Sequence, residues 1–258
     1  MVKSENHLSL QIQAKKCKWR EFMGQLVKIA VVIPAYNEEA SIASVVDAIN
    51  SLSTENLRLT PVVVNDCSRD TTGELIARLK CVPLHLPINL GIGGAVQTGV
   101  KFAFNNGFDL AIQIDADGQH PPQYIPTLVS ELEKNHWDVA IGSRFIDRQG
   151  FQSTLARRSG IRFLQWLLKL ITGRSVTDPT SGMRLMNRKA MKVIYDFYPD
   201  EYPEPEAIIL YYRRGLTFGE VPVRMNERQG GESSIQGLRG CYYMFKVTIA
   251  IIFTYLRK

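Results

Sequence analysis

The sequence predicts an α/β domain with a mostly parallel sheet covered by helices on both faces. From residue 28 onward, short apolar runs rich in Val and Ile alternate with segments of helical periodicity. The apolar runs are continuous, as expected of strands that are buried on both faces. The chain has 258 residues, 45% of them hydrophobic, which is enough for one large domain with a full core.

The chain divides into one large domain and two short flanking segments. Residues 1–27 are polar and basic, and we interpret them as an N-terminal appendage. Residues 28–236 carry the alternating elements without a Pro-, Gly- or Ser-rich linker, which indicates a single domain. Residues 237–258 form an apolar and basic C-terminal segment that we expect to be helical.

The elements of the first half follow one another in a regular order. Runs of Val, Ile and Leu predict the strands, apolar residues at helical spacing predict the helices, and Gly, Pro, Asn and Asp mark the turns. The expected strands cover 28–36, 61–66, 82–86, 110–115 and 138–144, and the expected helices cover 38–52, 71–80, 91–107 and 122–135.

The second half is less regular, and its clearest features are apolar. After a helical stretch, the run 217–225 resembles a strand. Within residues 161–171, one helical face carries Phe163, Leu164, Leu167, Leu168 and Ile171, and residues 241–258 are apolar and aromatic with basic interruptions. Such faces lie in membrane interfaces, although packing on the protein's own core explains the first stretch as well. Neither stretch has the ~18–20 uninterrupted apolar residues of a spanning helix, so we expect peripheral membrane contact.

Charge and cysteine content narrow the class of protein. The formal net charge of +6 suits an anionic partner such as a phosphorylated small molecule or a membrane surface. Dispersed basic residues and acidic strand ends argue against a nucleic-acid partner. The four cysteines show no metal-binding spacing and no secretory signal is present, so we expect a cytoplasmic protein.

Polar loops follow four of the expected strands, at residues 34–39, 65–70, 115–120 and 142–145. The carboxyl ends of parallel strands share one edge of a sheet, and ligands of α/β proteins bind beyond that edge. We therefore expect the functional site there.

Asp115 and Asp117 follow an apolar strand, and Gln119 follows at the same spacing. In extended backbone, residues two apart point to the same side, so the carboxylates can converge on one ion and Gln119 can add a third oxygen. Oxygen ligands alone favour Mg²⁺ or Mn²⁺. A D-x-D also arises by chance, but its position at a strand end favours a metal site.

Other residue types at the same edge suit phosphate and nucleotide binding. Asp66 ends the second strand, where a carboxylate can accept hydrogen bonds from a base or a ribose. Gly94 belongs to a glycine-rich helix start that permits close approach of a ligand. Arg144, Arg184 and Arg228 can clamp phosphates, although each alone is more often a solvated surface charge.

Three carboxylates of the second half are candidate general bases: Asp178, Glu204 and Glu206. The two glutamates flank a proline, which favours extended backbone before it. The first turn of a helix, where the dipole favours glutamate, explains the pair equally well.

Six motifs occur in one order along the chain: VVIPAYNEEASI, VVVNDCSRDTT, NLGIGGAVQTG, IQIDADGQHPP, VAIGSRF and SGMRLMNRKAM. This series resembles the family 2 glycosyltransferases with the GT-A fold, and most closely the dolichyl- or polyprenyl-phosphate sugar synthases. The resemblance covers about residues 28–236. It implies a nucleotide-diphospho-sugar transferase fold, followed here by C-terminal amphipathic, interfacial helices.

The residues and the resemblance together give four sets of site residues. The catalytic set is Asp117, Arg144, Asp178 and Glu206, and the metal ligands are Asp115, Asp117 and Gln119. The nucleotide-sugar donor is expected at Pro34, Ala35, Tyr36, Glu38, Asp66, Gly94, Asp115, Ala116 and Arg228. The acceptor phosphate is expected at Arg144, Arg158, Arg184 and Ser233, the last in an R-x-x-G-x-S loop that begins at Arg228.

Three features depart from the family pattern. Gly118 stands where leucine is frequent, and Met183 replaces the phenylalanine of S-G-F-R. The stretch 156–166 reads ARRSGIRFLQW in place of an S-R-x-x-N pattern, which leaves open which of its arginines meets a lipid phosphate.

The resemblance implies inverting, metal-dependent transfer of a sugar from a UDP- or GDP-sugar to undecaprenyl or dolichyl phosphate, with Mg²⁺ or Mn²⁺ as cofactor. The alternative is transfer to a hydroxyl of a growing cell-surface glycan, which requires a base such as Asp178 or Glu206. We expect a peripheral position at the inner face of the cell membrane, held by interfacial helices or by a small membrane protein partner.

Overall fold

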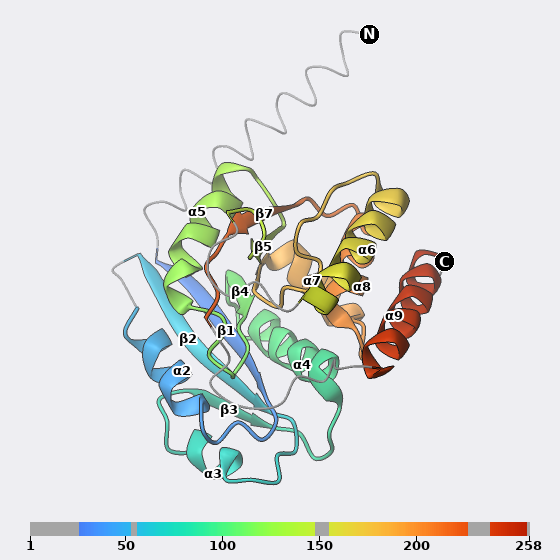
Figure 1. The fold of residues 1–258 in the computed structure, drawn as a ribbon. Coiled ribbons are helices and arrows are strands. Elements are labelled where there is room, and N and C mark those ends of the chain that lie inside the picture. The colour runs from blue at the N-terminus through green and yellow to red at the C-terminus, as the bar shows by residue number, and fades with distance from the viewer. Residues whose placement is uncertain (1–25, 53–55, 148–154, 227–237, 257–258) are drawn as a thin grey trace, which may run out of the picture.

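The computed structural model describes residues 26–52, 56–147, 155–226 and 238–256 (Figure 1). Of the predicted appendage at 1–27, only its last two residues are described, and the second of these, Val27, already begins the first strand.

A seven-stranded sheet forms the centre of the molecule, with the strand order β3-β2-β1-β4-β6-β5-β7. Only β6 runs antiparallel to its neighbours β4 and β5, while the other pairings are parallel. The predicted mostly parallel α/β sheet is therefore confirmed. The strands are β1 Val27–Ala35, β2 Leu57–Asn65, β3 Val82–His85, β4 Leu110–Gln113, β5 Val139–Ser143, β6 Arg184–Asn187 and β7 Phe218–Pro222.

The order of the strands reverses at β1. The chain moves outward from β1 through β2 to β3, and then returns so that β4 pairs with the other side of β1. Loops that leave the carboxyl ends of β1 and β4 diverge at such a point and open a crevice, which is where ligands bind in α/β sheets.

Helices cover both faces of the sheet (Figure 1). Alternate residues of β1 face opposite ways: Val31 and Ile33 pack with α2 and α5, whereas Val32 packs with α4 and the helices of the second half. The helices are α2 Ile42–Asn50, α3 Thr72–Ile76, α4 Gly91–Asn105, the 3₁₀ turn η1 Pro122–Tyr124, α5 Ile125–Lys134, α6 Leu155–Thr172, α7 Arg188–Asp196, α8 Pro203–Arg213 and α9 Leu238–Leu256.

Several elements differ from the sequence prediction, among them α3, which covers only Thr72–Ile76 of the expected 71–80. Strand β2 begins at Leu57, four residues earlier than expected, because Leu57–Thr60 pairs with the start of β1. Strand β6 was not predicted at all. It has only four residues, and it is extended because it fills the gap between β4 and β5.

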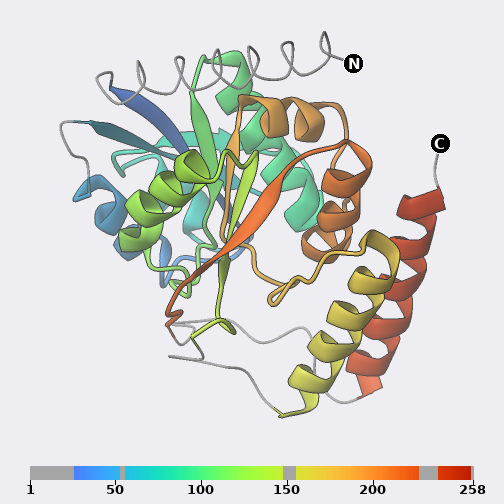
Figure 2. The ribbon, with the colours of Figure 1, turned by 90° about the horizontal axis from the view of Figure 1, so that it is seen from above.

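Helices α6 and α9 lie side by side at one edge of the molecule (Figure 2). Leu164 and Leu168 of α6 and Ile251 of α9 are buried in the core. For α6 this agrees with the alternative that part of its apolar surface packs on the protein itself. A second set of apolar side chains on the two helices is exposed: Phe163, Trp166, Leu170, Phe245, Ile249, Ile252, Phe253 and Leu256. We call this set the α6/α9 apolar face; its α9 members Ile249, Phe253 and Leu256 also line a hollow with Asp200, Glu201 and Glu206. Within the described part of the chain, no helix combines the length and hydropathy that a membrane crossing requires.

Candidate functional site

The loops after β1 and β2 are joined by hydrogen bonds. The backbone N–H of Asn37 donates to Ser68 Oγ at 3.0 Å, and the N–H of Arg69 donates to Asn37 Oδ1 at 2.8 Å. The N–H of Glu38 donates to Thr72 Oγ1 at 2.8 Å. Asn37 and Cys67 have positive φ values of 56° and 60°. This backbone conformation is strained for residues other than glycine, and such strain is often found at functional sites, where the surrounding structure enforces it.

These loops bring the predicted donor residues of the first two strands together. Ala35 is buried at the end of β1, Tyr36 is exposed beside it, and the backbone N–H of Asp66 donates to the Ala35 carbonyl at 2.9 Å. Asp66 is 3% exposed, and its Oδ1 accepts the N–H of Leu90 at 2.7 Å. A carboxylate held this way has a fixed orientation at the mouth of the crevice.

The glycines at the start of α4 have a structural explanation. A Cβ on Gly93 would lie 2.1 Å from the Pro199 carbonyl oxygen, and the Gly93 N–H donates to the Asp200 carbonyl at 3.3 Å. A Cβ on Gly94 would meet the Leu90 side chain at 2.5 Å. The close approach at both positions is therefore to the chain itself, which removes the reason for assigning Gly94 to the donor.

Asp115 and Asp117 lie in the loop after β4, beside the crevice. Asp117 is 3% exposed, and its Oδ1 accepts the backbone N–H of Gln119 at 2.9 Å. Asp115 is partly exposed and receives a hydrogen bond at 3.3 Å from Gln113 Nε2. The N–H of Asp115 donates to His120 Nδ1 at 3.0 Å, so this buried ring supports the loop.

The donor atoms of this loop fit a hard divalent cation. The carboxylates of Asp115 and Asp117 and the amide of Gln119 belong to one short loop, and Gln113 Oε1 is buried without a hydrogen-bond partner among the described residues. Within the described ranges, no group of three or more His, Cys, Asp or Glu residues could hold a metal ion, so protein carboxylates alone do not complete a site here. Mg²⁺ bound by one or two carboxylates takes its other ligands from water and substrate phosphates, so the loop suits an ion shared with a diphosphate.

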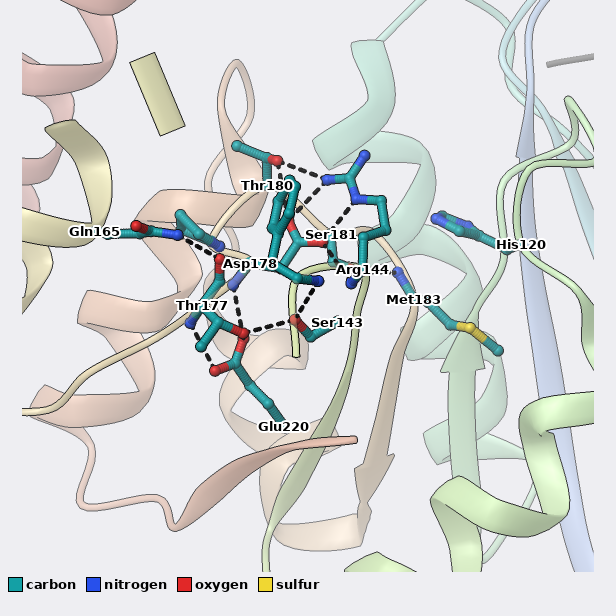
Figure 3. Close-up of polar contacts among 12 residues, drawn as sticks. His120, Ser143, Arg144, Gln165, Thr177, Asp178, Thr180, Ser181, Met183 and Glu220 are labelled. Carbon is teal, nitrogen blue, oxygen red and sulfur yellow. Dashed lines mark hydrogen bonds and ion pairs between the residues drawn. The ribbon is translucent and has the colours of Figure 1, made fainter. Parts of the chain in front are cut away.

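Arg144 and Asp178 form a buried pair beside this loop (Figure 3). Arg144 Nε and Nη2 donate to the two carboxylate oxygens of Asp178, each at 2.7 Å, and Nη2 also donates to Thr180 Oγ1 at 2.8 Å. Burial opposes the charge of Arg144, yet Asp178 together with Asp115 and Glu204 raises its pKa. Because both oxygens of Asp178 accept from Arg144, Asp178 is placed to orient the arginine and not to act as a base.

Glu220 of β7 holds the Asp178 segment from behind. Its carboxylate accepts the N–H of Thr177 at 2.6 Å, the N–H of Asp178 at 2.7 Å and the Thr177 hydroxyl at 2.9 Å (Figure 3). Burial raises the pKa of Glu220. No sequence pattern predicted a role for Glu220, because its hydrogen-bond partners lie more than forty positions away in the chain.

The remaining predicted residues lie in different surroundings. Glu206 faces α9, where its Oε2 accepts the Thr254 hydroxyl at 3.0 Å, and burial raises its pKa. Glu204, two residues earlier, is the carboxylate within electrostatic range of Arg144. Arg158 lies on α6 and is partly buried. Arg184 is 1% exposed, and its guanidinium donates to the backbone carbonyls of Pro179, Ser181 and Glu204, which favours a structural role over contact with an acceptor phosphate.

Arg228 and Ser233 lie outside the described residues. Asn226, the last described residue before them, donates its N–H to the carbonyl of Gln119 at 3.0 Å, in the loop of Asp115 and Asp117, which we call the acidic loop.

Comparison with known proteins assigns the family. The model of glycosyl transferase family 2 matches residues 30–195. The chain belongs to this family. As a family 2 member it is a glycosyltransferase, as the sequence motifs predicted.

Two relatives share most of their length with this family 2 chain. A UDP-N-acetylglucosamine–dolichyl-phosphate N-acetylglucosaminyltransferase of Methanococcus voltae is 31% identical over 216 residues, covering 76% of this chain and 84% of that protein. A polyprenol monophosphomannose synthase of Mycolicibacterium smegmatis is 27% identical over 227 residues, covering 84% of each chain. The homologues are thus polyprenyl-phosphate sugar transferases.

A solved structure confirms the predicted GT-A fold. Glucosyl-3-phosphoglycerate synthase from Mycobacterium tuberculosis, in complex with Mg²⁺ and UDP, superimposes with a TM-score of 0.64 at 20% sequence identity. The match covers 92% of this chain and 83% of that structure.

Proposed function

We propose that this enzyme transfers a sugar, with inversion, from a nucleotide diphosphate sugar to a polyprenyl phosphate at a membrane surface. The observation that carries the proposal is the pairing of an oxygen-only acidic loop, Asp115 and Asp117, with the buried Arg144–Asp178 pair in its electrostatic range. The acidic loop suits a diphosphate with its cation, and the Arg144–Asp178 pair suits the phosphate of an acceptor. The names of the two relatives support the same donor and acceptor classes.

The donor is held at the crevice between β1 and β4. We assign its base and ribose to the joined loops that carry Tyr36, Glu38 and Asp66, and its diphosphate to the loop of Asp115 and Asp117. When bound there, Mg²⁺ or Mn²⁺ supplies Lewis-acid neutralisation of the leaving diphosphate. Asp115 and Asp117 would hold this cation, and His120 and Gln113 fix Asp115 through the contacts at 3.0 and 3.3 Å.

The arrangement of carboxylates favours a phosphate acceptor over a sugar hydroxyl. A hydroxyl acceptor requires a base. Of the three candidate bases, Asp178 is bound by Arg144 and Glu206 faces α9, which leaves Glu204 as the candidate near Arg144. A phosphate monoester is already an anion near neutral pH, because its second pKa is about 6. Its oxygen attacks the anomeric carbon from the side opposite the diphosphate, which inverts the configuration, while Arg144 holds the acceptor charge.

The α6/α9 apolar face supplies the membrane contact of the proposal. Its exposed aromatic and aliphatic side chains suit the boundary between headgroups and acyl chains, and basic residues such as Arg162 and Lys169 suit anionic headgroups. We therefore propose a peripheral position at the inner face of the cell membrane. This face makes the contact directly, so the proposal does not require the small membrane protein partner expected from the sequence.

One experiment tests the proposed reaction. Purified protein is incubated with labelled UDP- or GDP-sugars, Mg²⁺ or Mn²⁺, and either polyprenyl phosphate in vesicles or a soluble glycan. We expect label in an organic-extractable product that mild acid cleaves, as a sugar linked through a phosphate requires. Label that appears only on the glycan would falsify the lipid-phosphate acceptor.

A further inference from the structure

Arg184 is the largest fully buried side chain of the described residues, and its charge has no ion-pair partner among them. It begins β6 and lies opposite Gln113 of β4 in the antiparallel register. A buried charge without a counter-ion is costly, and hydrogen bonds from Nε and Nη2 offset part of the lost hydration, while Nη1 is buried without a hydrogen-bond partner among the described residues. These hydrogen bonds show what Arg184 holds in place.

The guanidinium of Arg184 bonds to backbone carbonyls from two segments. Nε donates to the Ser181 carbonyl at 2.9 Å, and Nη2 donates to the Pro179 carbonyl at 3.3 Å and to the Glu204 carbonyl at 2.5 Å. The group also lies 5.9 Å from the centre of the Tyr211 ring in α8. Arg184 therefore joins residues 178–182, which we call the clamp loop, to the first turn of α8.

The clamp loop contacts both halves of the proposed site. At its start, Asp178 and Thr180 hold the guanidinium of Arg144. At its end, Gly182 covers the acidic loop: a Cβ there would lie 2.9 Å from Gln113 Nε2 and 3.1 Å from Asp115 Oδ1. A shift of this loop would move Arg144 and displace Asp115 together.

We propose that Arg184 is a positioning residue that sets the spacing between Arg144 and Asp115, and that it does not bind the acceptor phosphate. The nitrogens of Arg184 hold the clamp loop at a fixed distance from α8. Because Gly182 of this loop packs against Asp115, the position of the loop also fixes the position of the Asp115 carboxylate. This role of Arg184 rests on the proposed function only in taking polyprenyl phosphate as the acceptor. Its effect on the donor side is independent of the acceptor.

The test therefore measures donor binding without an acceptor. UDP and GDP are titrated in turn into the whole protein in the presence of Mn²⁺, with calorimetric detection. Arg184→Lys keeps the charge, but one ammonium cannot reproduce the fork that meets three carbonyls. We expect the affinity for the nucleotide that binds wild type to fall about 10- to 100-fold, as for other residues that orient metal ligands.

Arg188 provides a matched control on the same segment of chain. Its guanidinium donates to the Phe108 carbonyl at 2.8 Å and lies 4.6 Å from the centre of the Phe104 ring, which repeats the chemistry of Arg184. Phe108 precedes β4, so this contact is at the opposite end of the strand from Asp115. Arg188→Lys should lower thermal stability without weakening nucleotide binding.

A second variant covers the case in which Arg184→Lys does not fold. Gly182→Ala leaves Arg184 intact and places a methyl group against Asp115, so it should also weaken nucleotide binding in Mn²⁺. Unchanged affinity in both variants, or equal losses in Arg184→Lys and Arg188→Lys, would overturn the proposal.

Kinetics with the acceptor separate the two roles of Arg184. A lower kcat with an unchanged KM for polyprenyl phosphate supports positioning, whereas a raised acceptor KM with unchanged nucleotide affinity shows direct contact and overturns it. If wild type transfers no sugar to polyprenyl phosphate, the proposed function fails, and the nucleotide titrations still decide the role of Arg184.

Discussion

Single residues of the acidic loop show what spacing predicts and what it does not. The pair Asp115 and Asp117 is readable, because a period of two at a strand end places both carboxylates on one side. The residues that hold this pair in place could not be predicted from spacing. His120 accepts a backbone N–H that belongs to Asp115, and Arg184 binds carbonyls at positions 179, 181 and 204. Backbone partners carry no side-chain signal in a sequence.

Asp117→Asn tests the acidic loop at the residue scale. The amide oxygen still accepts the Gln119 N–H, so the loop should keep its shape, but the charge that attracts a cation is lost. We expect turnover to fall at least about 100-fold with an unchanged melting temperature. Transfer rates with Mn²⁺ and a thermal melt measure both quantities.

Asp109→Asn is the control for that prediction. Asp109 lies just before β4, at the opposite end from the acidic loop, and its Oδ2 accepts the Lys28 N–H at 2.9 Å. The control should retain full turnover. If Asp117→Asn and a metal chelator both leave the rate untouched, the metal assignment is wrong.

At the scale of elements, periodicity predicted the first half of the fold and missed β6. Strands β1, β4 and β5 are apolar runs buried on both faces, and they lie where such runs predict them. Strand β6 begins with Arg184 and ends with Asn187, and its extended form depends on the two strands that it joins. Pairing of that kind is tertiary, so a local pattern does not show it.

Glu220→Ala tests how β7 supports the clamp loop. The substitution removes the acceptor of three hydrogen bonds from Thr177 and Asp178, so the carboxylate that grips Arg144 becomes less ordered. We expect kcat to fall about 10- to 100-fold and nucleotide affinity to fall less, because Glu220 holds the Asp178 end of the clamp loop while Arg184 still holds Pro179 and Ser181, next to Gly182 and Asp115. Single-turnover transfer and nucleotide titration distinguish the two quantities.

The control for Glu220→Ala is Glu131→Ala on α5. Glu131 bonds only within its own helix in the contacts described, to Lys134 and Asn135. Its removal should leave kcat unchanged. Equal losses in both variants would show that Glu220 acts through general stability alone.

At the scale of the whole molecule, the sheet separates a stabilising edge from a functional one. Asp138 lies before β5 and accepts hydrogen bonds from Asn187, Lys189 and Thr217, which join β5 to β6, α7 and β7. This cluster is at the amino end of β5, whereas Arg144 follows its carboxyl end. Stability and catalysis should therefore respond to separate substitutions.

Asp138→Asn tests the stabilising edge through its pH dependence. Burial alone would raise the pKa of Asp138, but the hydrogen bonds from Lys189, Asn187 and Thr217 outweigh it and lower the pKa below 3.8. A lowered pKa gives stability that is present above 3.8 and is lost as the pH falls through the folded value. Wild type should exceed the variant in free energy of unfolding at neutral pH, and the difference should shrink below pH 3.8. A difference that is constant with pH would contradict the charge-based explanation, and urea unfolding at several pH values decides.

The α6/α9 apolar face is the feature of the whole molecule that membrane contact depends on. Trp166 is 58% exposed and Phe253 is 69% exposed; burying a fully exposed side chain of this kind contributes about 1.5–3 kcal/mol, so each residue contributes a corresponding part of that on entering the interface. Trp166→Glu with Phe253→Glu should abolish sedimentation with vesicles of anionic lipid, and should lower transfer to polyprenyl phosphate in those vesicles without altering nucleotide affinity. Leu26→Glu, an exposed apolar position at the start of β1, is the control and should still bind vesicles. Full vesicle binding by the double variant would show that the face packs against something other than a bilayer, since two buried carboxylates are incompatible with an interfacial position.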